Sequence, residues 1–124
     1  MWRLPDSIPI FLYSHPADLR RGFDGLCALA EGAMGKNPMQ GGLYLFCNRR
    51  RDQVKILFWE RDGLCIYHKR LERGRFQLPQ APSHPQRGPV CLSASQLFYI
   101  LDGIALKSVK PLRRFRLPPS TLAA

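Results

Sequence analysis

Arginine and lysine side chains are concentrated in two segments of this chain of 124 residues, which carries a formal net charge of +10. Residues 49–75 hold nine basic and four acidic residues, and residues 107–116 hold five basic residues and no acid. A clustered basic surface attracts polyanions, and each phosphate that a cation neutralises releases counterions, which makes binding favourable and sensitive to salt. The charge pattern therefore favours contact with nucleic acid over the alternative, a solvated basic face that binds nothing specific.

Three consecutive arginines, Arg49, Arg50 and Arg51, lie in a short polar connection between two predicted strands. Arginine at the tip of a β-ribbon can reach a phosphate or a guanine edge, and such a ribbon can enter a major groove. The alternative is that turns are polar and often contain arginine. Because three adjacent arginines repel one another, we favour a binding role, with Lys55 of the following strand as a further contact.

A second basic cluster covers residues 69–76, which read KRLERGRF. Gly74 lies between two arginines and would let the backbone approach a phosphate closely. Glu72 could instead pair with a neighbouring cation at the surface, which adds little stability. Both interpretations of this cluster are open. The predicted nucleic-acid contacts of the two clusters are Arg49, Arg50, Arg51, Lys55, Lys69, Arg70, Arg73 and Arg75.

Three aromatic residues, Trp59, Tyr67 and Phe76, stand near these cations in the sequence. Surfaces that combine aromatic and cationic side chains bind single strands by stacking with the bases. Large aromatic residues are more often core residues or anchors of a protein interface. We favour the core or interface role for these three.

No residue pattern indicates catalysis or a bound metal. Metal-dependent phosphoryl transfer needs clustered carboxylates, whereas the nine acids here are scattered and most stand beside a base. His15, His68 and His84 are isolated from one another, and no phosphate-binding loop or nucleophile elbow is present. We predict a protein that is not an enzyme and binds no metal or cofactor. Asp24 is not assigned: it could cap or bond a neighbouring backbone group, or pair with Arg20 or Arg21.

The sequence favours a cytoplasmic protein without a membrane partner. No apolar run reaches the roughly 20 residues of a spanning helix, and the N-terminus lacks the apolar core of a signal peptide. Cytosolic thiols stay reduced, so disulfides are not expected. We interpret the cysteines as small packing residues. They are Cys27, Cys47, Cys65 and Cys91.

Two helices and one flanking strand are predicted around the basic clusters. Residues 8–13 form a strand, and because Pro9 lacks an N–H this strand should start a sheet or lie at its edge. Residues 18–33 have helical apolar spacing. Gly22 and Gly25 inside this helix are explained by close approach to the sheet. A second helix covers residues 93–101, with a capping box at its start.

Residues 43–47, 53–59 and 63–71 are three predicted strands with short polar linkers, which favour antiparallel neighbours. One sheet face should pack on the first helix, and the other should mix aromatic residues with cations. The fold class is therefore α+β: an antiparallel β-meander of three to four strands packed on one long N-terminal helix, with a second short C-terminal helix. Residues 1–106 form the domain, which includes a Pro-rich loop over 77–89, and residues 107–124 form a basic, Pro-rich tail.

Four sequence blocks resemble the TnpB-type accessory protein of the IS sixty-six transposon group. Residues 18–26 read DLRRGFDGL and resemble that family's first signature, and residues 48–64 resemble its second block. Residues 69–76 and the closing L-x-G-I at 101–104 match two more. The blocks occur in order between residues 8 and 104. The family-motif residues outside the basic clusters are Arg20, Arg21, Gly22, Asp24, Gly25 and Trp59.

This resemblance implies an accessory factor for DNA transposition, encoded beside a separate DDE-type transposase. The RNA-guided nucleases that are also called TnpB are several times larger and carry a carboxylate triad that this chain lacks. Our first hypothesis is that the basic clusters bind DNA at the ends of the element, which would place the protein at the nucleoid. The alternative is an adaptor that docks the transposase, or self-associates as a homo-oligomer, without direct DNA contact. A nuclease that depends on Asp24 is the weakest hypothesis.

Overall fold

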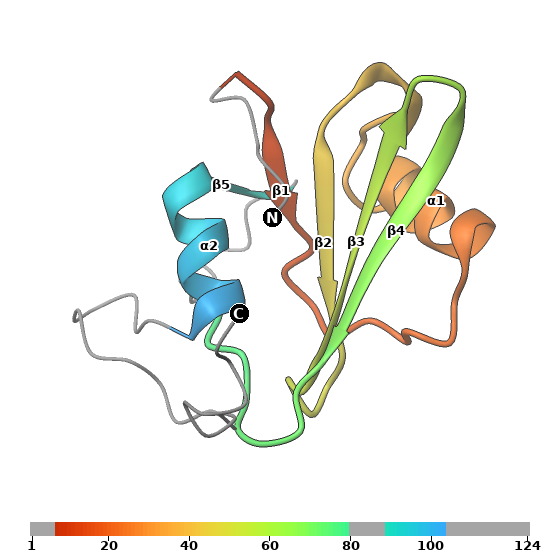
Figure 1. Ribbon diagram of the computed structural model, residues 1–124. Coiled ribbons are helices and arrows are strands. Elements are labelled where there is room, and N and C mark those ends of the chain that lie inside the picture. The colour runs from red at the N-terminus through yellow and green to blue at the C-terminus, as the bar shows by residue number, and fades with distance from the viewer. Residues whose placement is uncertain (1–6, 80–88, 104–124) are drawn as a thin grey trace, which may run out of the picture.

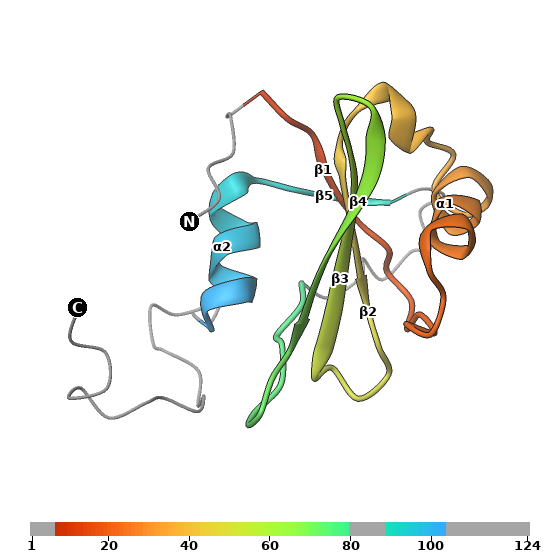
Figure 2. The ribbon, with the colours of Figure 1, turned by 45° about the vertical axis from the view of Figure 1, so that its right-hand side comes forward.

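A five-stranded sheet with one helix on each face forms the centre of this computed structural model, which describes residues 7–79 and 89–103 (Figure 1). In Figures 1 and 2, α1 and α2 lie on opposite sides of the sheet. The helices are α1 (Phe23–Gly32) and α2 (Ala94–Asp102), with a short 3-10 turn, η1 (Pro38–Gln40). The strands are β1 (Ile10–Leu12), β2 (Leu43–Cys47), β3 (Gln53–Glu60), β4 (Gly63–Arg70) and β5 (Val90–Leu92).

The spatial order of the strands is β4-β3-β2-β1-β5. The antiparallel meander predicted from the short linkers is confirmed for β2, β3 and β4. The prediction of three to four strands in a purely antiparallel sheet is wrong, because β1 pairs in parallel with β2 and β5 adds a fifth strand beside β1. β1 is therefore not an edge strand. Pro9 lies just before β1, and the Pro9 carbonyl accepts a hydrogen bond from the Leu43 N–H (2.9 Å). Because Pro9 lies outside the strand, its missing N–H removes no hydrogen bond between the strands.

A helix packs on each face of the sheet, and β4 stays partly exposed. Strand alternation sends Val54 and Ile56 to the core on the α2 side, whereas Leu57 belongs to the core on the α1 side. Leu97 and Ile100 of α2 are fully buried against the first of these cores. This face on the α2 side mixes aromatic residues with a cation as expected, because Phe58, Tyr67 and Lys69 share it, and α2 packs over part of it.

Helix α1 is shorter than predicted and starts at Phe23 rather than at residue 18. The preceding turn is held by Asp18, whose carboxylate accepts a hydrogen bond from the Arg20 N–H (3.0 Å). Gly22 is the residue before the helix, and a Cβ there would meet nothing within 4 Å. A Cβ at Gly25 would meet the Arg21 side chain at 3.0 Å. The explanation of these glycines by close approach to the sheet is wrong.

Helix α2 has the predicted capping box. The Ser93 Oγ accepts from the Gln96 N–H (3.1 Å), and the Gln96 Oε1 accepts from the Ser93 N–H (2.8 Å). The helix ends at Gly103, which has a left-handed conformation and whose N–H donates to the Tyr99 carbonyl. Within residues 7–79 and 89–103, no helix is long and apolar enough to cross a membrane.

Candidate nucleic-acid interface

The β2–β3 hairpin is closed by one side chain, that of Asn48. Its Oδ1 accepts hydrogen bonds from the N–H groups of Asp52 and Gln53, both at 3.1 Å. Its Nδ2 donates to the Asp52 carboxylate (2.7 Å). These bonds satisfy the polar groups inside the turn, so the three arginines between Asn48 and Asp52 are left exposed at its tip.

Replacement of Asn48 by alanine should lower the free energy of unfolding by about 1–3 kcal/mol, because two backbone donors and one carboxylate lose their partner. Urea unfolding followed by circular dichroism measures the change. Asn37→Ala is the matched control, since the Asn37 Oδ1 accepts a single exposed bond, from Met39 N–H. We expect a smaller loss there, and equal losses for the two variants would contradict this role of Asn48.

Arg51 has a left-handed backbone, with φ at 59°. A residue with a Cβ is disfavoured in this region, which glycine occupies without strain. Arg61, in the β3–β4 hairpin, has the same conformation, with φ at 54°. The two arginines sit at opposite ends of β3, because this strand runs from Gln53 to Glu60.

Arg51→Gly and Arg61→Gly should each raise the stability of the protein by up to about 1 kcal/mol, because each removes a strained residue. Thermal unfolding of both variants checks the gain. A loss of stability in Arg51→Gly alone would show that the Arg51 side chain makes a stabilising contact at its own end of the sheet.

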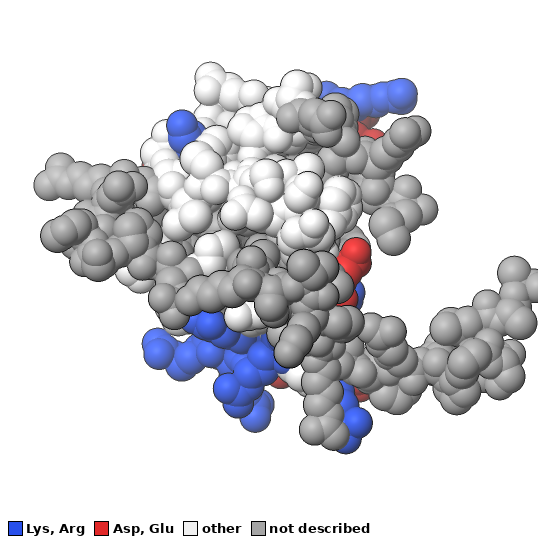
Figure 3. Space-filling model, turned by 90° about the vertical axis from the view of Figure 1, so that its left-hand side faces the viewer, with Lys and Arg blue, Asp and Glu red and all other residues white. Residues whose placement is uncertain are grey.

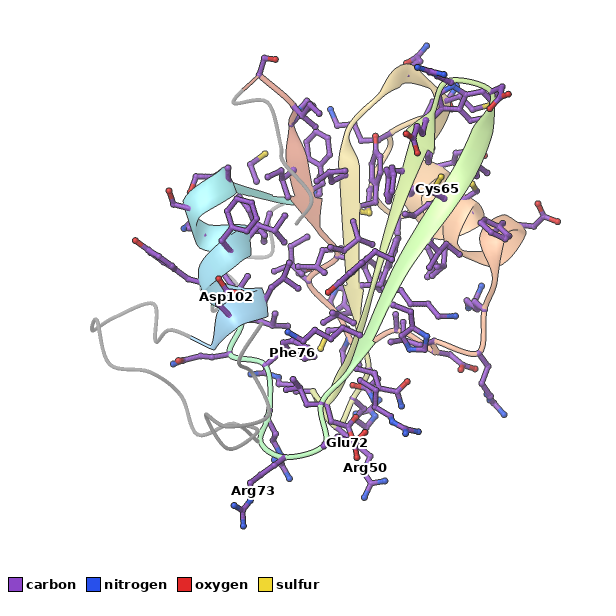
Figure 4. All side chains as sticks on the ribbon, in the orientation of Figure 1. Arg50, Cys65, Glu72, Arg73, Phe76 and Asp102 are labelled. Atoms are coloured by element: carbon purple, nitrogen blue, oxygen red, sulfur yellow. The ribbon has the colours of Figure 1, made fainter. Side chains whose placement is uncertain are left out.

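The chain after β4 returns alongside this hairpin. The Leu71 N–H donates to the Asp52 carbonyl (2.8 Å), and the Phe76 N–H donates to the Arg51 carbonyl (2.6 Å). The Phe76 ring is only 1% exposed and packs in the core beneath α2, as Figure 4 shows. This anchor holds the intervening residues at the same end of the sheet as the hairpin tip.

The result is a cluster of exposed arginines at one end of the molecule, which we call the basic end. Figure 3 shows Lys and Arg side chains gathered there, and in Figure 4 Arg50 and Arg73 both point outward from this end. All of these arginines belong to the first basic segment, and the second, residues 107–116, lies outside the described residues. The residues of the basic end are Arg49, Arg50, Arg51, Arg70, Arg73 and Arg75.

The two predicted lysines are placed differently. Lys55 donates to the Arg21 carbonyl (3.0 Å) on the α1 side, whereas Lys69 donates to the Leu101 carbonyl (2.9 Å) in the last turn of α2. A cation near a helix C-terminus is favoured by the helix dipole. Each lysine thus links the sheet to a neighbouring segment, and the structure does not bring them into the basic end.

The carboxylates near the basic end do not neutralise its positive charge. Glu72 contacts Arg70 at 3.5 Å, with both side chains 67% exposed, so this pair adds little. Asp52 is held by Asn48. Partial burial lowers the pKa of His68, and the charges of Lys55 and Arg70 act in the same direction. His68 is therefore neutral at pH 7 and adds no charge.

The other residues singled out in the sequence lie away from the basic end or have structural contacts. Trp59 is half-buried, and its Nε1 donates to the Arg61 carbonyl (3.1 Å) in the opposite hairpin. Hydrogen bonds from the Arg20 guanidinium lower the pKa of Asp18 to about 2. Asp24 is exposed in the first turn of α1, whose N-terminus has no side-chain cap.

The cysteines are free thiols with different surroundings. Cys47 is buried, which raises its pKa to about 11, so it is an inert packing residue as expected. Cys91, in contrast, is exposed, which does not fit that interpretation. In the described part of the chain, no three His, Cys, Asp or Glu side chains are grouped as metal ligands would be. His84 lies outside the described residues.

Sequence reasoning missed several residues at this end. Tyr13, Ser14 and His15 follow β1, and because β1 is parallel to β2 they come beside Asn48 and Arg51. The parallel pairing of β1 with β2 would have indicated these residues, because the carboxyl ends of parallel strands lie at the same edge of a sheet.

Comparison with known proteins identifies the family of this α+β chain. It matches the family described as IS66 Orf2 like protein over residues 8–111 and belongs to that family, as the sequence blocks predicted. This is an accessory family of transposition, associated with a transposase in the same element and not known as catalytic.

Two relatives come from Sinorhizobium fredii, and both are uncharacterized proteins. The chain is 32% identical to y4hO over 98 residues, covering 79% of this chain and 82% of y4hO. It is 29% identical to y4jC over 110 residues, covering 87% of this chain and 91% of y4jC. No solved structure matches the chain.

Proposed function

We propose that this protein is a non-enzymatic accessory factor that assists transposition by binding DNA through its basic end. The observation that carries the proposal is the gathering of arginines from the β2–β3 hairpin and from the segment after β4 around one buried anchor, Phe76. Solubility does not require charges of one sign to cluster, because a surface with both signs of charge interspersed is also soluble.

The exposed arginines of the basic end suit DNA. Arginine at a hairpin tip can contact phosphates or bond guanine in a bidentate manner. Arg51 is exposed at the tip of this hairpin beside Arg49 and Arg50, so its guanidinium is accessible to a phosphate.

A salt titration tests the proposal. Fluorescence anisotropy of labelled duplexes, one from the element's end and one of random sequence, gives the affinity between about 50 and 300 mM salt. Four to six phosphate contacts predict a slope of log affinity against log salt of roughly −3.6 to −5.4. Absence of binding at low salt, or an affinity that does not change with salt, would refute the proposal. A difference between the two duplexes measures sequence preference.

An adaptor without DNA contact is the second candidate, and the surface on the α2 side favours it. Tyr67 is 38% exposed and Tyr99 is 45% exposed. Figure 3 shows few charged side chains over this side. Co-purification with the transposase in high salt after nuclease treatment, together with no DNA shift, would favour this role. Sedimentation of the protein alone distinguishes self-association from docking.

A further inference from the structure

A hollow of about 220 Å³ lies at the carboxyl ends of β1 and β2, next to the basic end. The segment after β1 is fixed along β2 by two hydrogen bonds, from the Tyr13 N–H to the Leu45 carbonyl (3.0 Å) and from the Ala17 N–H to the Cys47 carbonyl (2.8 Å). In open α/β sheets, ligands bind in the crevice outside the carboxyl ends of parallel strands, and β1 and β2 form a parallel pair in this sheet. The hollow has this position.

Aromatic and apolar groups form much of its wall. The Tyr13 and His15 rings meet edge to face with centroids 5.6 Å apart, and Tyr13 also packs on Phe46 at 5.8 Å, which anchors it to the core. Leu78 and Pro79 add apolar surface. The volume exceeds the ~150 Å³ of a cavity that holds benzene and is below the ~300 Å³ of sites for drug-sized ligands. One nucleobase is of a suitable size.

The polar part of the lining suits an anion. Arg51 contributes to it, and no acidic side chain in residues 7–79 or 89–103 forms a salt bridge with this guanidinium. Arginine binds phosphate through paired N–H donors. The lining residues include no carboxylate, and the exposed Ser14 provides a hydroxyl group.

From this arrangement we infer that the hollow binds a nucleoside phosphate, with the base against Tyr13 and His15 and the phosphate on Arg51. The same chemistry is offered by a free nucleotide and by an unpaired nucleotide at the end of a DNA strand. Because Arg49 and Arg50 adjoin Arg51 in the hairpin, DNA held at the basic end would lie next to the hollow, within reach of an unpaired nucleotide at its end. The assignment to a strand end rests on the proposed function, whereas the nucleotide chemistry of the hollow does not.

The test compares a blunt duplex, the same duplex with a short single-stranded overhang containing 2-aminopurine, and free 2-aminopurine deoxyribonucleoside monophosphate. Stacking of one base predicts that the overhang raises affinity about 5- to 100-fold and quenches the 2-aminopurine fluorescence. His15→Ala should remove this preference, because it deletes the ring that would contact the base, and His15 is exposed, so no core packing is lost. Arg49→Gln should weaken both duplexes equally and retain the preference.

The outcomes separate the two proposals. Equal affinity of the wild type for blunt and overhanging duplexes, or a preference that survives in His15→Ala, overturns the strand-end assignment while DNA binding stands. If the free nucleotide binds the wild type but not His15→Ala, and no DNA binds, the nucleotide site in the hollow is supported and the DNA-binding role is overturned. Failure of all three probes to bind overturns both. Tyr13→Leu is a second variant for the same test, because it replaces the Tyr13 ring, which would contact the base, with an apolar side chain.

Discussion

Replacement of Arg50 and Arg73 by glutamine in one variant is expected to weaken DNA binding by 10- to 100-fold at 0.1 M salt. Both side chains point outward from the basic end (Figure 4), so neither change should disturb packing. Each lost phosphate contact removes about 0.9 from the slope of log affinity against log salt, so the slope should become shallower by about 2. Anisotropy titrations at several salt concentrations measure both quantities.

The matched control removes the same charge elsewhere. Lys36 lies over the Phe11 ring at 5.1 Å, and Arg61 is in the β3–β4 hairpin. The double variant Lys36→Gln/Arg61→Gln should retain most of the affinity and nearly the full salt slope. If both double variants lose affinity equally, net charge rather than the basic end governs binding, and the localised interface proposed here is wrong.

The sequence predicted the parts of the fold that depend on neighbouring residues. The bounds of β2 were correct, and β3 and β4 were each found to within one residue, because alternation and short polar linkers are local signals. The capping box of α2 was equally local. Ser93 and Gln96 are three residues apart, and their reciprocal bonds follow from that spacing.

The parts that were missed depend on contacts between distant residues. The parallel pairing of Ile10 with Leu43 joins residues on either side of α1, and no local pattern indicates it. β5 has three residues, too few for alternation to be detected. α2 packs on the sheet face opposite α1, and only the tertiary structure shows this. Residues 80–88 of the predicted Pro-rich loop and the tail from residue 107 lie outside the described residues.

The candidate site was predicted in composition but not in geometry. Consecutive arginines in a turn are visible in the sequence, and their exposure follows from the turn. The approach of Arg73 and Arg75 to that turn depends on burial of Phe76, a residue that the sequence could assign only to core or interface. Lys55 bonds a backbone carbonyl instead of joining the cluster, because strand alternation directs it to the α1 side.

Phe76→Ala is expected to lower the free energy of unfolding by about 3–5 kcal/mol, because it deletes a fully buried ring and leaves a cavity beneath α2. Small domains have only about 5–15 kcal/mol in total, so the variant would be close to unfolding. Urea denaturation measures the loss. Phe23→Ala deletes the same atoms from a side chain that is 48% exposed, and it should cost no more than about 1 kcal/mol.

The same residue tests whether packing creates the interface. Phe76→Leu keeps most of the apolar volume and the backbone bond to Arg51, so it should remain folded and bind DNA with nearly the wild-type salt slope. In Phe76→Ala, at temperatures where the domain is still folded, the segment carrying Arg73 and Arg75 loses its anchor, and the slope should become shallower although every arginine is present. A folded Phe76→Ala variant with an unchanged slope would show that the arginines act independently of this anchor, and that the basic end is not a preformed surface.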